Sequence, residues 1–467
     1  MKATGTLVST AAMLVVGVAS PASALSHRST IHVSCDTGAL INAINRANAH
    51  GGTLHLAHKC TYHLTSAYTA NDGLPPITQR ITIKGNGATI QRDTGNFRIF
   101  EVDAPHGNLT AYDLTIKGGN LATSGAYGAG VYVQRGAKLL LVDSTVTGNT
   151  NTDRGGGIAN FGRTTLTHTT VTDNSTNQYG GGIYSVGKLS IDKNSRLNTN
   201  HAAQRGGALQ LDGGTAKIDH TTIHGNSTTS SNSFGGGVYV ESAEIELDDS
   251  TITNNTTVRN GGGLYNDGKA VLRGLRIEGN STTSSNNSAG GGGLYNDAWM
   301  EGYKLKVQGN TSAAWGGGIY TDYGSLTLRD SQISRNQANT RAGGIYTDWT
   351  ATLTRTTVSD NTVTNTSGQG AGIYNDWSLV LDDARVTRNK ATGASSQGGG
   401  IYNTSFGRPD RGNLQIRKTK ITKNSASTAG GVWTDTQFTV FRDSTITNNT
   451  PTNCIGSAAS PVYHCTN

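Results

Sequence analysis

A column of acidic residues recurs through the second half of this 467-residue chain. Each member lies two positions after the Tyr position of a recurring G-G-[IVL]-Tyr segment. Carboxylates held close together can act as acid and base on a glycosidic bond, or can bind a cation such as Ca²⁺. We therefore take Asp322, Asp348 and Asp376 as candidate catalytic residues, and Ca²⁺ as a candidate ligand of the column. This acidic column consists of Asp212, Glu241, Asp267, Asp297, Asp322, Asp348, Asp376 and Asp435, with Thr404 at the same position of one coil.

Aromatic residues accompany the acidic column in its later members. Flat rings can stack on the faces of sugars, while neighbouring carboxylates bond the hydroxyl groups. The pattern predicts a surface that binds a polysaccharide, and its candidate substrate-binding residues are Trp299, Tyr320, Tyr323, Tyr346, Trp349, Tyr374 and Trp377.

Two irregular segments interrupt the repeat. In residues 200–226 Gln210 replaces the Tyr, and His201 and Arg205 lie close by in sequence. These two are further catalytic candidates, as a proton donor or base and as a clamp for an acidic sugar. The alternative is a set of surface side chains where the repeat departs from its consensus. The insertion Ser405–Asn413 carries Arg411, and we expect it to be a solvated loop.

The repeat itself determines which elements must position these residues. Its first motif recurs every 25 to 31 residues, with the apolar residue at Val131, Ile158, Ile183, Leu209, Val238, Leu264, Leu294, Ile319, Ile345, Ile373, Ile401 and Val432. A second motif, [IVL]-x-x-Asn, keeps step with the first. Its asparagines are Asn149, Asn174, Asn200, Asn226, Asn255, Asn280, Asn310, Asn336, Asn361, Asn389, Asn424 and Asn449.

Alternation at period two within each unit predicts short strands, with Ile, Leu and Val inside and Tyr, Thr, Arg and Lys outside. Units of this length without helical periodicity are typical of an all-β solenoid, a single-stranded parallel β-helix with coils about 4.8 Å apart. The Asn column then has a structural explanation, because Asn tolerates a left-handed turn and its amide can bond the neighbouring coils. Since a parallel ladder brings like residues together in every coil, the acidic column has a structural alternative as well.

The repeat resembles that of the right-handed parallel β-helix proteins of the pectin-lyase-like group. It also resembles surface proteins such as the polymorphic membrane proteins, whose coils carry GGAI and FxxN tetrapeptides. Here Ile or Val replaces the Phe, as in Thr251–Asn255. The resemblance implies a right-handed coil and action on an extracellular polysaccharide, as a lyase or a glycoside hydrolase. The chain lacks the Gly-His-Gly motif of polygalacturonases and has no residue-by-residue match to the pectate lyase site, so non-catalytic adhesion is the alternative function.

The N-terminus has the pattern of a secretory signal peptide. Lys2 precedes an apolar run, and Ala22-Ser23-Ala24 forms a cleavage pattern, so residues 1–24 are predicted to be removed. The run is too short to span a bilayer, and no later segment is long enough. We therefore expect a secreted, extracellular protein without a membrane span.

The two ends of the mature chain are predicted to be caps. A helix over 38–49, capped by Asp36 or Thr37, would cover the first coil with Leu40, Ala43, Ile44 and Ala47. Sequence proximity favours disulfides Cys35–Cys60 and Cys454–Cys465 among three possible pairings. The predicted division is an N-terminal cap at 25–60, a β-helix at 61–450 and a C-terminal cap at 451–467.

Composition excludes several classes of protein. Charged residues make up 15% of the chain and the net charge is +7, which argues against an intrinsically disordered polyelectrolyte. The 63 glycines lack the period of collagen. No Lys/Arg run with interleaved aromatics occurs, so we expect no nucleic-acid partner. We expect a monomer, and we set aside an ice-binding face because charges interrupt its Thr pairs.

Overall fold

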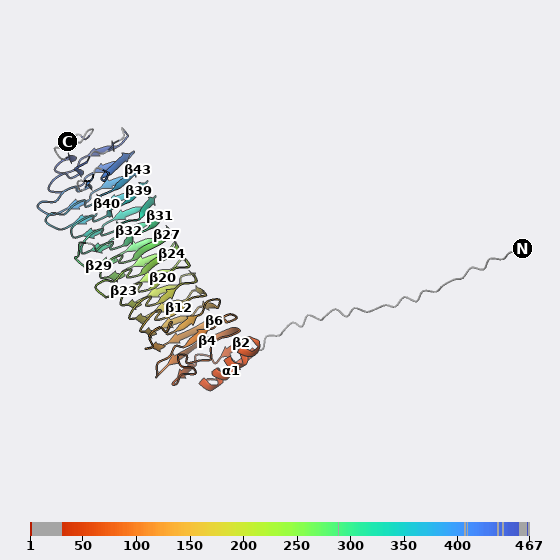
Figure 1. Cartoon of the computed structure of the whole chain (residues 1–467). Coiled ribbons are helices and arrows are strands. Elements are labelled where there is room, and N and C mark those ends of the chain that lie inside the picture. The colour runs from red at the N-terminus through yellow and green to blue at the C-terminus, as the bar shows by residue number, and fades with distance from the viewer. Residues whose placement is uncertain are drawn as a thin grey trace.

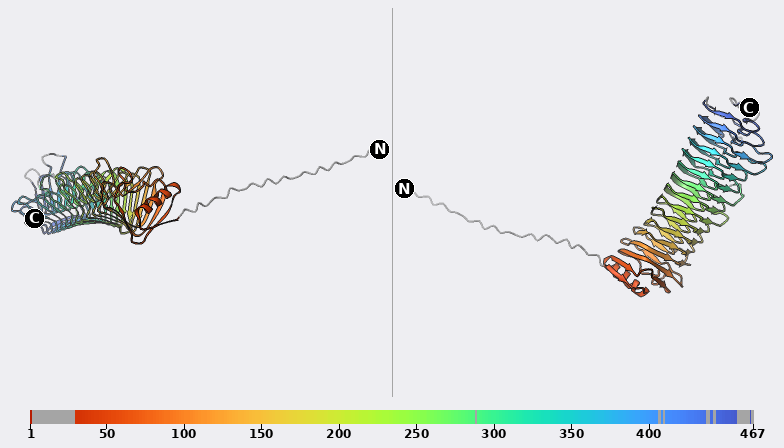
Figure 2. Two further views of the ribbon diagram at one scale, coloured as in Figure 1. Left: turned by 90° about the horizontal axis from the view of Figure 1, so that it is seen from below. Right: turned by 180° about the vertical axis from the view of Figure 1, so that it is seen from behind.

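The computed structural model describes Met1 and residues 30–287, 289–405, 408, 410–436, 439, 440, 443–456 and 465. The predicted signal peptide lies outside these residues except for Met1, as does most of the predicted C-terminal cap. The chain forms one long stack of coils that runs from the N-terminal to the C-terminal end (Figure 1). Two further views show the same regular stacking along the whole length (Figure 2).

Every coil pairs with the next through parallel strands, which confirms the predicted all-β parallel β-helix. The strands form four ladders. Ladder 1 contains the G-G-[IVL]-Tyr segments: β5 (Phe100–Val102), β8 (Val131–Val133), β12 (Ile158–Asn160), β16 (Ile183–Ser185), β20 (Leu209–Asp212), β24 (Val238–Asp248), β27 (Leu264–Arg273), β30 (Leu294–Asn296), β34 (Ile319–Thr321), β38 (Ile345–Thr347), β42 (Ile373–Asn375), β46 (Ile401–Asn403), β49 (Val432–Thr434) and β52 (Cys454–Gly456).

Ladder 2 follows ladder 1 in each coil and shares β24 and β27 with it. Its other strands are β1 (Thr30–Val33), β2 (Gly52–Leu56), β4 (Arg80–Arg92), β6 (Asn108–Lys117), β9 (Lys138–Val142), β13 (Arg163–Thr167), β17 (Lys188–Asp192), β21 (Thr215–Asp219), β31 (Trp299–Tyr303), β35 (Ser325–Arg329), β39 (Thr350–Thr354), β43 (Ser378–Asp382), β47 (Asn413–Arg417) and β50 (Thr439–Val440).

Ladder 3 ends just before the Asn column, and it includes the second halves of β4 and β6. Its other strands are β3 (Thr61–Leu64), β10 (Thr145–Thr147), β14 (Thr170–Thr172), β18 (Arg196–Asn198), β22 (Thr222–His224), β25 (Thr251–Thr253), β28 (Arg276–Glu278), β32 (Lys306–Gln308), β36 (Gln332–Ser334), β40 (Thr357–Ser359), β44 (Arg385–Thr387), β48 (Lys420–Thr422) and β51 (Thr445–Thr447).

Ladder 4 is made of two-residue strands and completes each coil. Its strands are β7 (Asn120–Leu121), β11 (Thr150–Asn151), β15 (Ser175–Thr176), β19 (His201–Ala202), β23 (Ser227–Thr228), β26 (Thr256–Thr257), β29 (Ser281–Thr282), β33 (Thr311–Ser312), β37 (Gln337–Ala338), β41 (Thr362–Val363) and β45 (Lys390–Ala391). The interior of the coils is filled by stacked Ile, Leu and Val side chains, as period-two alternation predicts.

The Asn column forms a continuous buried hydrogen-bond ladder. Asn200 is typical: its backbone N donates to Asn226 Oδ1 at 2.9 Å, and its Nδ2 donates to the same oxygen at 3.1 Å and to Val171 O at 2.9 Å. This confirms that the asparagines bridge successive coils. The left-handed residue, however, is the one before each Asn, for example Asp173 with φ of 55°. The prediction that Asn itself occupies the left-handed turn is therefore wrong.

The N-terminal end has the predicted helix, α1 (Thr37–His50), which is the one helix among the described residues. Asp36 is its N-cap and accepts a hydrogen bond from Ala39 N at 2.7 Å. The predicted apolar face is buried. Both predicted disulfides are present, Cys35–Cys60 and Cys454–Cys465. No helix in the described part of the chain is long and apolar enough to cross a membrane.

Candidate functional site

The acidic column lies within or immediately after the strands of ladder 1, so successive members are stacked coil on coil. Asp322 N donates to Asn296 O, Asp348 N to Thr321 O and Asp376 N to Thr347 O, each at 2.9 Å. These bonds continue the parallel ladder and fix the column along the solenoid axis. The three predicted catalytic aspartates therefore lie at one position of successive coils.

The Tyr residues of the same segments are buried, which corrects the prediction that they lie outside. Tyr320, Tyr346 and Tyr374 are only 3%, 2% and 1% exposed. They leave ladder 1 on its outer side, but the chain that enters the strand from the preceding turn folds over them: a Cβ on Gly290 would lie 2.5 Å from Tyr320 Cδ1. Their rings cannot stack on a sugar, because neighbouring rings already cover them, as between Tyr346 and Tyr374 at 4.8 Å.

The buried Tyr stack supports the acidic column through its hydroxyl groups. Tyr265 Oη donates to Asp297 Oδ2 at 3.0 Å, and Tyr295 Oη donates to Asp322 Oδ2 at 2.8 Å. Burial raises the pKa of Asp322, the Tyr295 hydrogen bond opposes that rise, and the carboxylates of Asp297 and Asp348 add to it. A stack of carboxylates thus repels itself, as the spacing of the ladder requires.

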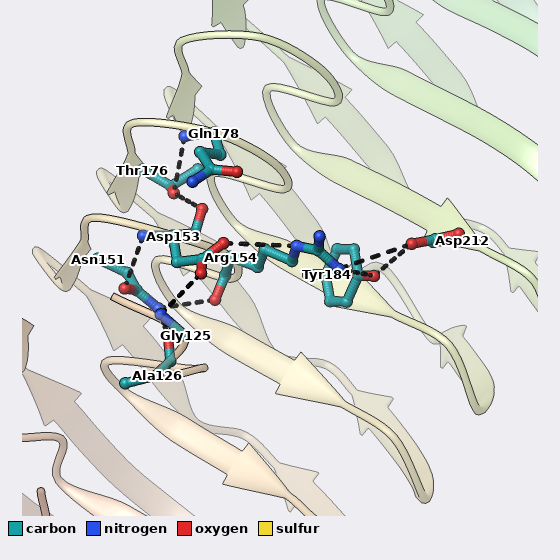
Figure 3. Close-up of polar contacts among 9 residues, drawn as sticks. All are labelled: Gly125, Ala126, Asn151, Asp153, Arg154, Thr176, Gln178, Tyr184 and Asp212. Carbon is teal, nitrogen blue, oxygen red and sulfur yellow. Dashed lines mark hydrogen bonds and ion pairs between the residues drawn. The ribbon is translucent and has the colours of Figure 1, made fainter. Parts of the chain in front are cut away.

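At the N-terminal end of the acidic column, an arginine reaches in from the turn before ladder 1 (Figure 3). Arg154 Nη1 donates to Tyr184 Oη at 3.0 Å, and Tyr184 Oη in turn donates to Asp212 Oδ2. The turn that carries Arg154 is itself held by Asn151, whose Nδ2 donates to Arg154 O at 2.7 Å and to Ala126 O at 3.1 Å. Asp212 is thereby tied to the scaffold.

His201 and Arg205 do not form one site with the predicted aspartates. His201 Nδ1 lies 3.1 Å from Ser227 Oγ, and burial lowers its pKa. Arg205 Nη1 donates to Glu241 Oε1 at 2.8 Å and packs over Tyr239. Arg205 and Asp348 belong to coils five steps apart in the register. At about 4.8 Å per step they are separated by roughly 24 Å along the axis.

The insertion at 405–413 is held at both ends rather than solvated throughout. At its start, Ser405 N donates to Asp435 Oδ1 at 2.8 Å. At its end, Asn403 Nδ2 donates to Gly412 O at 2.8 Å, and Asn413 N donates to Trp377 O at 2.7 Å. Gly412 has φ of 70°, a conformation that glycine adopts without strain. These anchors direct Arg411 back to the acidic column.

Arg411 joins two predicted catalytic residues, which the sequence alone did not indicate. Its Nη1 lies 3.4 Å from Asp348 Oδ1 and 3.4 Å from Asp376 Oδ2. The Asp376 side chain is 3% exposed and that of Asp348 is 28% exposed. Burial and the adjacent Asp348 carboxylate raise the pKa of Asp376 to about 7, and Arg411 opposes this rise. Asp376 Oδ1 and Arg411 Nε are buried and have no hydrogen-bond partner.

Exposed and partly exposed aromatic residues form a ridge beside these carboxylates. This aromatic ridge consists of Trp299, Tyr323, Trp349 and Trp377, of which Trp299 and Tyr323 are 39% and 71% exposed. Trp349 and Trp377 stack at 4.6 Å with 21° between their planes, and Arg411 lies 4.8 Å over the Trp377 ring. Both faces of Trp377 are therefore covered. Trp299, Tyr323 and the face of Trp349 toward Tyr323 are left as contact surfaces.

The pair Asp348 and Asp376 does not fit the predicted Ca²⁺ site. Arg411 places a guanidinium between Asp348 and Asp376, where a shared cation would have to lie. Among the described residues, one group offers metal-ligand atoms that all lie within 4.8 Å of one another, namely Asp219, His220 and Asp249, and it is not part of the column. We assign no metal-dependent step to the acidic column.

Comparison with known proteins identifies a family. Residues 103–271 and 201–407 match the family described as "Right handed beta helix region". No curated protein sequence matches the chain. Two solved structures of mutant tailspike proteins from E. coli bacteriophage HK620, one of them in complex with a hexasaccharide, are each 13% identical and cover 87% of this chain and 74% of their own, with TM-scores of 0.32 and 0.27. The family match extends over more than half of the residues, and the chain belongs to the right-handed β-helix family.

Proposed function

We propose that the protein is exported, binds a linear extracellular polysaccharide along the aromatic ridge, and hydrolyses its glycosidic bonds at Asp348 and Asp376. The observation that carries the proposal is the carboxyl pair beside the ridge, clamped by Arg411. The two disulfides are compatible with an oxidising, extracellular compartment.

The two carboxyl groups differ in access and in protonation. Asp348 is the more exposed member and is the one placed to contact a sugar. Asp376 lies behind it and keeps its proton up to about pH 7, since burial and Asp348 raise its pKa. Asp376 therefore acts through Asp348, which passes a proton to the glycosidic oxygen and takes one back from the attacking water. Water is added across the bond, the departing hydroxyl receives a proton, and a new reducing end forms.

Arg411 and Trp377 are positioning residues in this proposal. The guanidinium of Arg411 contacts both carboxylates. Its stacking over the Trp377 ring orients it toward them. Sugar contact is assigned to Trp299, Tyr323 and Trp349, whose rings have exposed surface beside Asp348 or in the two preceding coils.

A second candidate function is binding without cleavage, as in an adhesion solenoid. The low exposure of Asp376 favours it, because a buried carboxyl group cannot itself reach a glycosidic oxygen. The acidic column also continues over many coils, as a scaffold feature would.

The test is release of reducing ends from a panel of neutral and acidic polysaccharides at several pH values. Wild type, Asp348→Asn and Asp330→Asn are compared, with Asp330 as an exposed aspartate outside the column. We expect cleavage by wild type and by Asp330→Asn, and loss of cleavage with retained binding in Asp348→Asn. Binding without any release of reducing ends assigns the protein to the second function. An unsaturated product would instead indicate a lyase.

A further inference from the structure

A hollow lies on the outer face of ladder 2, in the N-terminal half of the solenoid and away from the acidic column. It has two parts, with volumes of about 350 Å³ and 440 Å³. Both parts are lined by Arg163 and Thr165, so they form one groove that crosses successive coils. The floor consists of short or aliphatic outward-facing side chains such as Leu140 and Thr165, and the rim is basic.

The rim cations are stacked by the register of ladder 2. Arg80 pairs with Asn108, which pairs with Lys138, and the column continues through Arg163 and Lys188. Three consecutive coils thus each present a cation, at a spacing of about 4.8 Å. Lys217 adds a further one. We call this feature the basic groove and define it by Arg80, Lys138, Arg163, Lys188 and Lys217.

The cations of the basic groove are exposed and, within the described part of the chain, none forms an ion pair with a carboxylate. Elsewhere on the surface, Arg355 is paired with Asp330 and Arg388 with Asp360. The acidic residues at the end of the groove are Glu244 and Glu246, and Glu244 faces Lys269. Asp192 and Asp219 lie at the opposite edge of their strands. Glu246 is the register neighbour of Lys217, so the uncompensated positive charge is that of Arg80, Lys138, Arg163 and Lys188.

We propose that the basic groove binds a linear polysaccharide with an anionic group on each sugar, laid parallel to the solenoid axis. The repeated cations match a repeated carboxylate or sulfate. Hydroxyl groups in the middle position of the same strands, at Thr110, Thr165 and Ser190, provide hydrogen-bond partners for sugar hydroxyls.

The lining of the groove argues for a polysaccharide rather than a single-stranded nucleic acid. Binding of single strands combines a basic track with aromatic rings on which bases stack. Tyr112 is the one aromatic residue among those that line the groove, and Lys84 Nζ lies 3.5 Å from its ring centroid. The lining therefore lacks a series of rings on which successive bases could stack.

This groove is independent of the acidic column. It belongs to another ladder and to earlier coils, and its ligand is anionic, whereas the acidic column would repel such a ligand. Binding in the basic groove can therefore be tested independently of hydrolysis at Asp348.

The experiment measures the affinity of the whole mature protein for polygalacturonate, for chondroitin sulfate, for neutral dextran and for a single-stranded oligothymidine, at low and at physiological salt. We expect binding of the uronate or sulfate polymer that weakens with salt, and no binding of dextran. The double variant Arg163→Glu/Lys188→Glu should lose about tenfold or more in affinity, since it reverses two adjacent charges.

The matched control is Lys390→Glu/Lys420→Glu, which makes the same change in net charge at exposed positions of ladders 4 and 3. It should bind like wild type. The proposal is overturned if wild type binds neither acidic polymer, if the control loses as much affinity as the groove variant, or if oligothymidine binds more tightly than both polymers. Because binding alone is measured, failure of cleavage does not affect the result.

Discussion

Arg411 Nη1 lies 3.4 Å from Asp376 Oδ2, although 35 residues separate the two in sequence. This contact distinguishes Asp348 and Asp376 from the other members of the acidic column. Asp297 and Asp322 each accept from a Tyr hydroxyl and Glu241 from Arg205, but here one guanidinium reaches two carboxyl groups in successive coils. The proposed site therefore depends on the insertion that carries Arg411.

Arg411→Ala should raise the pKa of Asp376 further. The guanidinium opposes the rise that burial and Asp348 cause, and its removal leaves those two effects uncompensated. Carboxyl ¹³C chemical shifts followed over pH would measure the pKa of Asp376 directly. The alkaline limb of any pH–activity profile should also move to higher pH. Arg411→Lys, which retains the charge, should show a smaller shift. An unchanged titration in Arg411→Ala would contradict the contact.

Asp376→Asn should make the protein more stable at alkaline pH. Because the folded state holds the Asp376 proton up to about pH 7, and an unfolded Asp releases it near pH 4, the wild-type free energy of unfolding falls as pH rises through that window. The contribution is at most about 4 kcal/mol, since one pKa unit corresponds to about 1.36 kcal/mol.

The measurement is the melting temperature of wild type and Asp376→Asn from pH 4 to pH 8, where the variant should show a flatter dependence. Asp330→Asn is the control, because the pKa of Asp330 is shifted in the opposite direction from that of Asp376. Arg355 lowers the pKa of the exposed Asp330, so any contribution from this carboxylate is lost only at lower pH. Equal pH dependence of wild type and Asp376→Asn would show that Asp376 does not carry the raised pKa.

Much of the fold could be predicted because its signals are repeated. The inward Ile, Leu and Val positions and the Asn column each recur coil after coil, so no single substitution hides the period. The helix over 37–50 was also accessible, since Asp36 and the spacing of Leu40 and Ile44 are local signals. Alternation predicts which side chains point outward from a strand, but it cannot predict whether another segment of the chain then buries them. Tyr346 leaves its strand on the outer side, and only the path of the neighbouring turn makes it 2% exposed.

The candidate site was predictable only in part, for a similar reason. Asp348 and Asp376 belong to the repeat and could be found from it. Arg411 lies in an insertion, and its direction is set by contacts with Asp435 and Asn403 that have no periodic signal. A usable hint was the coincidence of the insertion with Thr404, where the acidic column lacks a carboxylate.

Trp349→Ala should weaken binding of the polysaccharide. The ring has one face against Trp377 and the other toward Tyr323, so it is placed to contact sugar beside Asp348. We expect a loss of about 1 kcal/mol, or roughly five- to tenfold in affinity, as for other aromatic contacts. Isothermal titration with the best ligand of the panel would measure it. Tyr303→Ala removes an aromatic that is 39% exposed, like Trp299, but lies at the opposite end of β31 from the ridge, and this variant should bind normally.

The Asn column is expected to stabilise the solenoid independently of any ligand, and Asn255→Ala tests this. Asn255 Nδ2 donates to Ile223 O at 3.0 Å and to Asn280 Oδ1 at 2.9 Å, while its Oδ1 accepts from Asn226 N at 2.9 Å. Alanine leaves several buried polar groups unpaired, at about 1–3 kcal/mol each, so we expect a loss of about 3 kcal/mol or more in unfolding free energy.

The control for that variant is Thr251→Ala, in the same coil but partly exposed, which should change stability by less than about 1 kcal/mol. Because each coil contacts mainly its neighbours, the loss in Asn255→Ala should be local before it is global. Hydrogen exchange should therefore accelerate first at the amides of Asn226 and Asn255, and later in distant coils. Uniform acceleration along the whole solenoid would mean that the coils unfold as one cooperative unit. Equal stability of Asn255→Ala and Thr251→Ala would show that the buried Asn ladder contributes little to the free energy of unfolding.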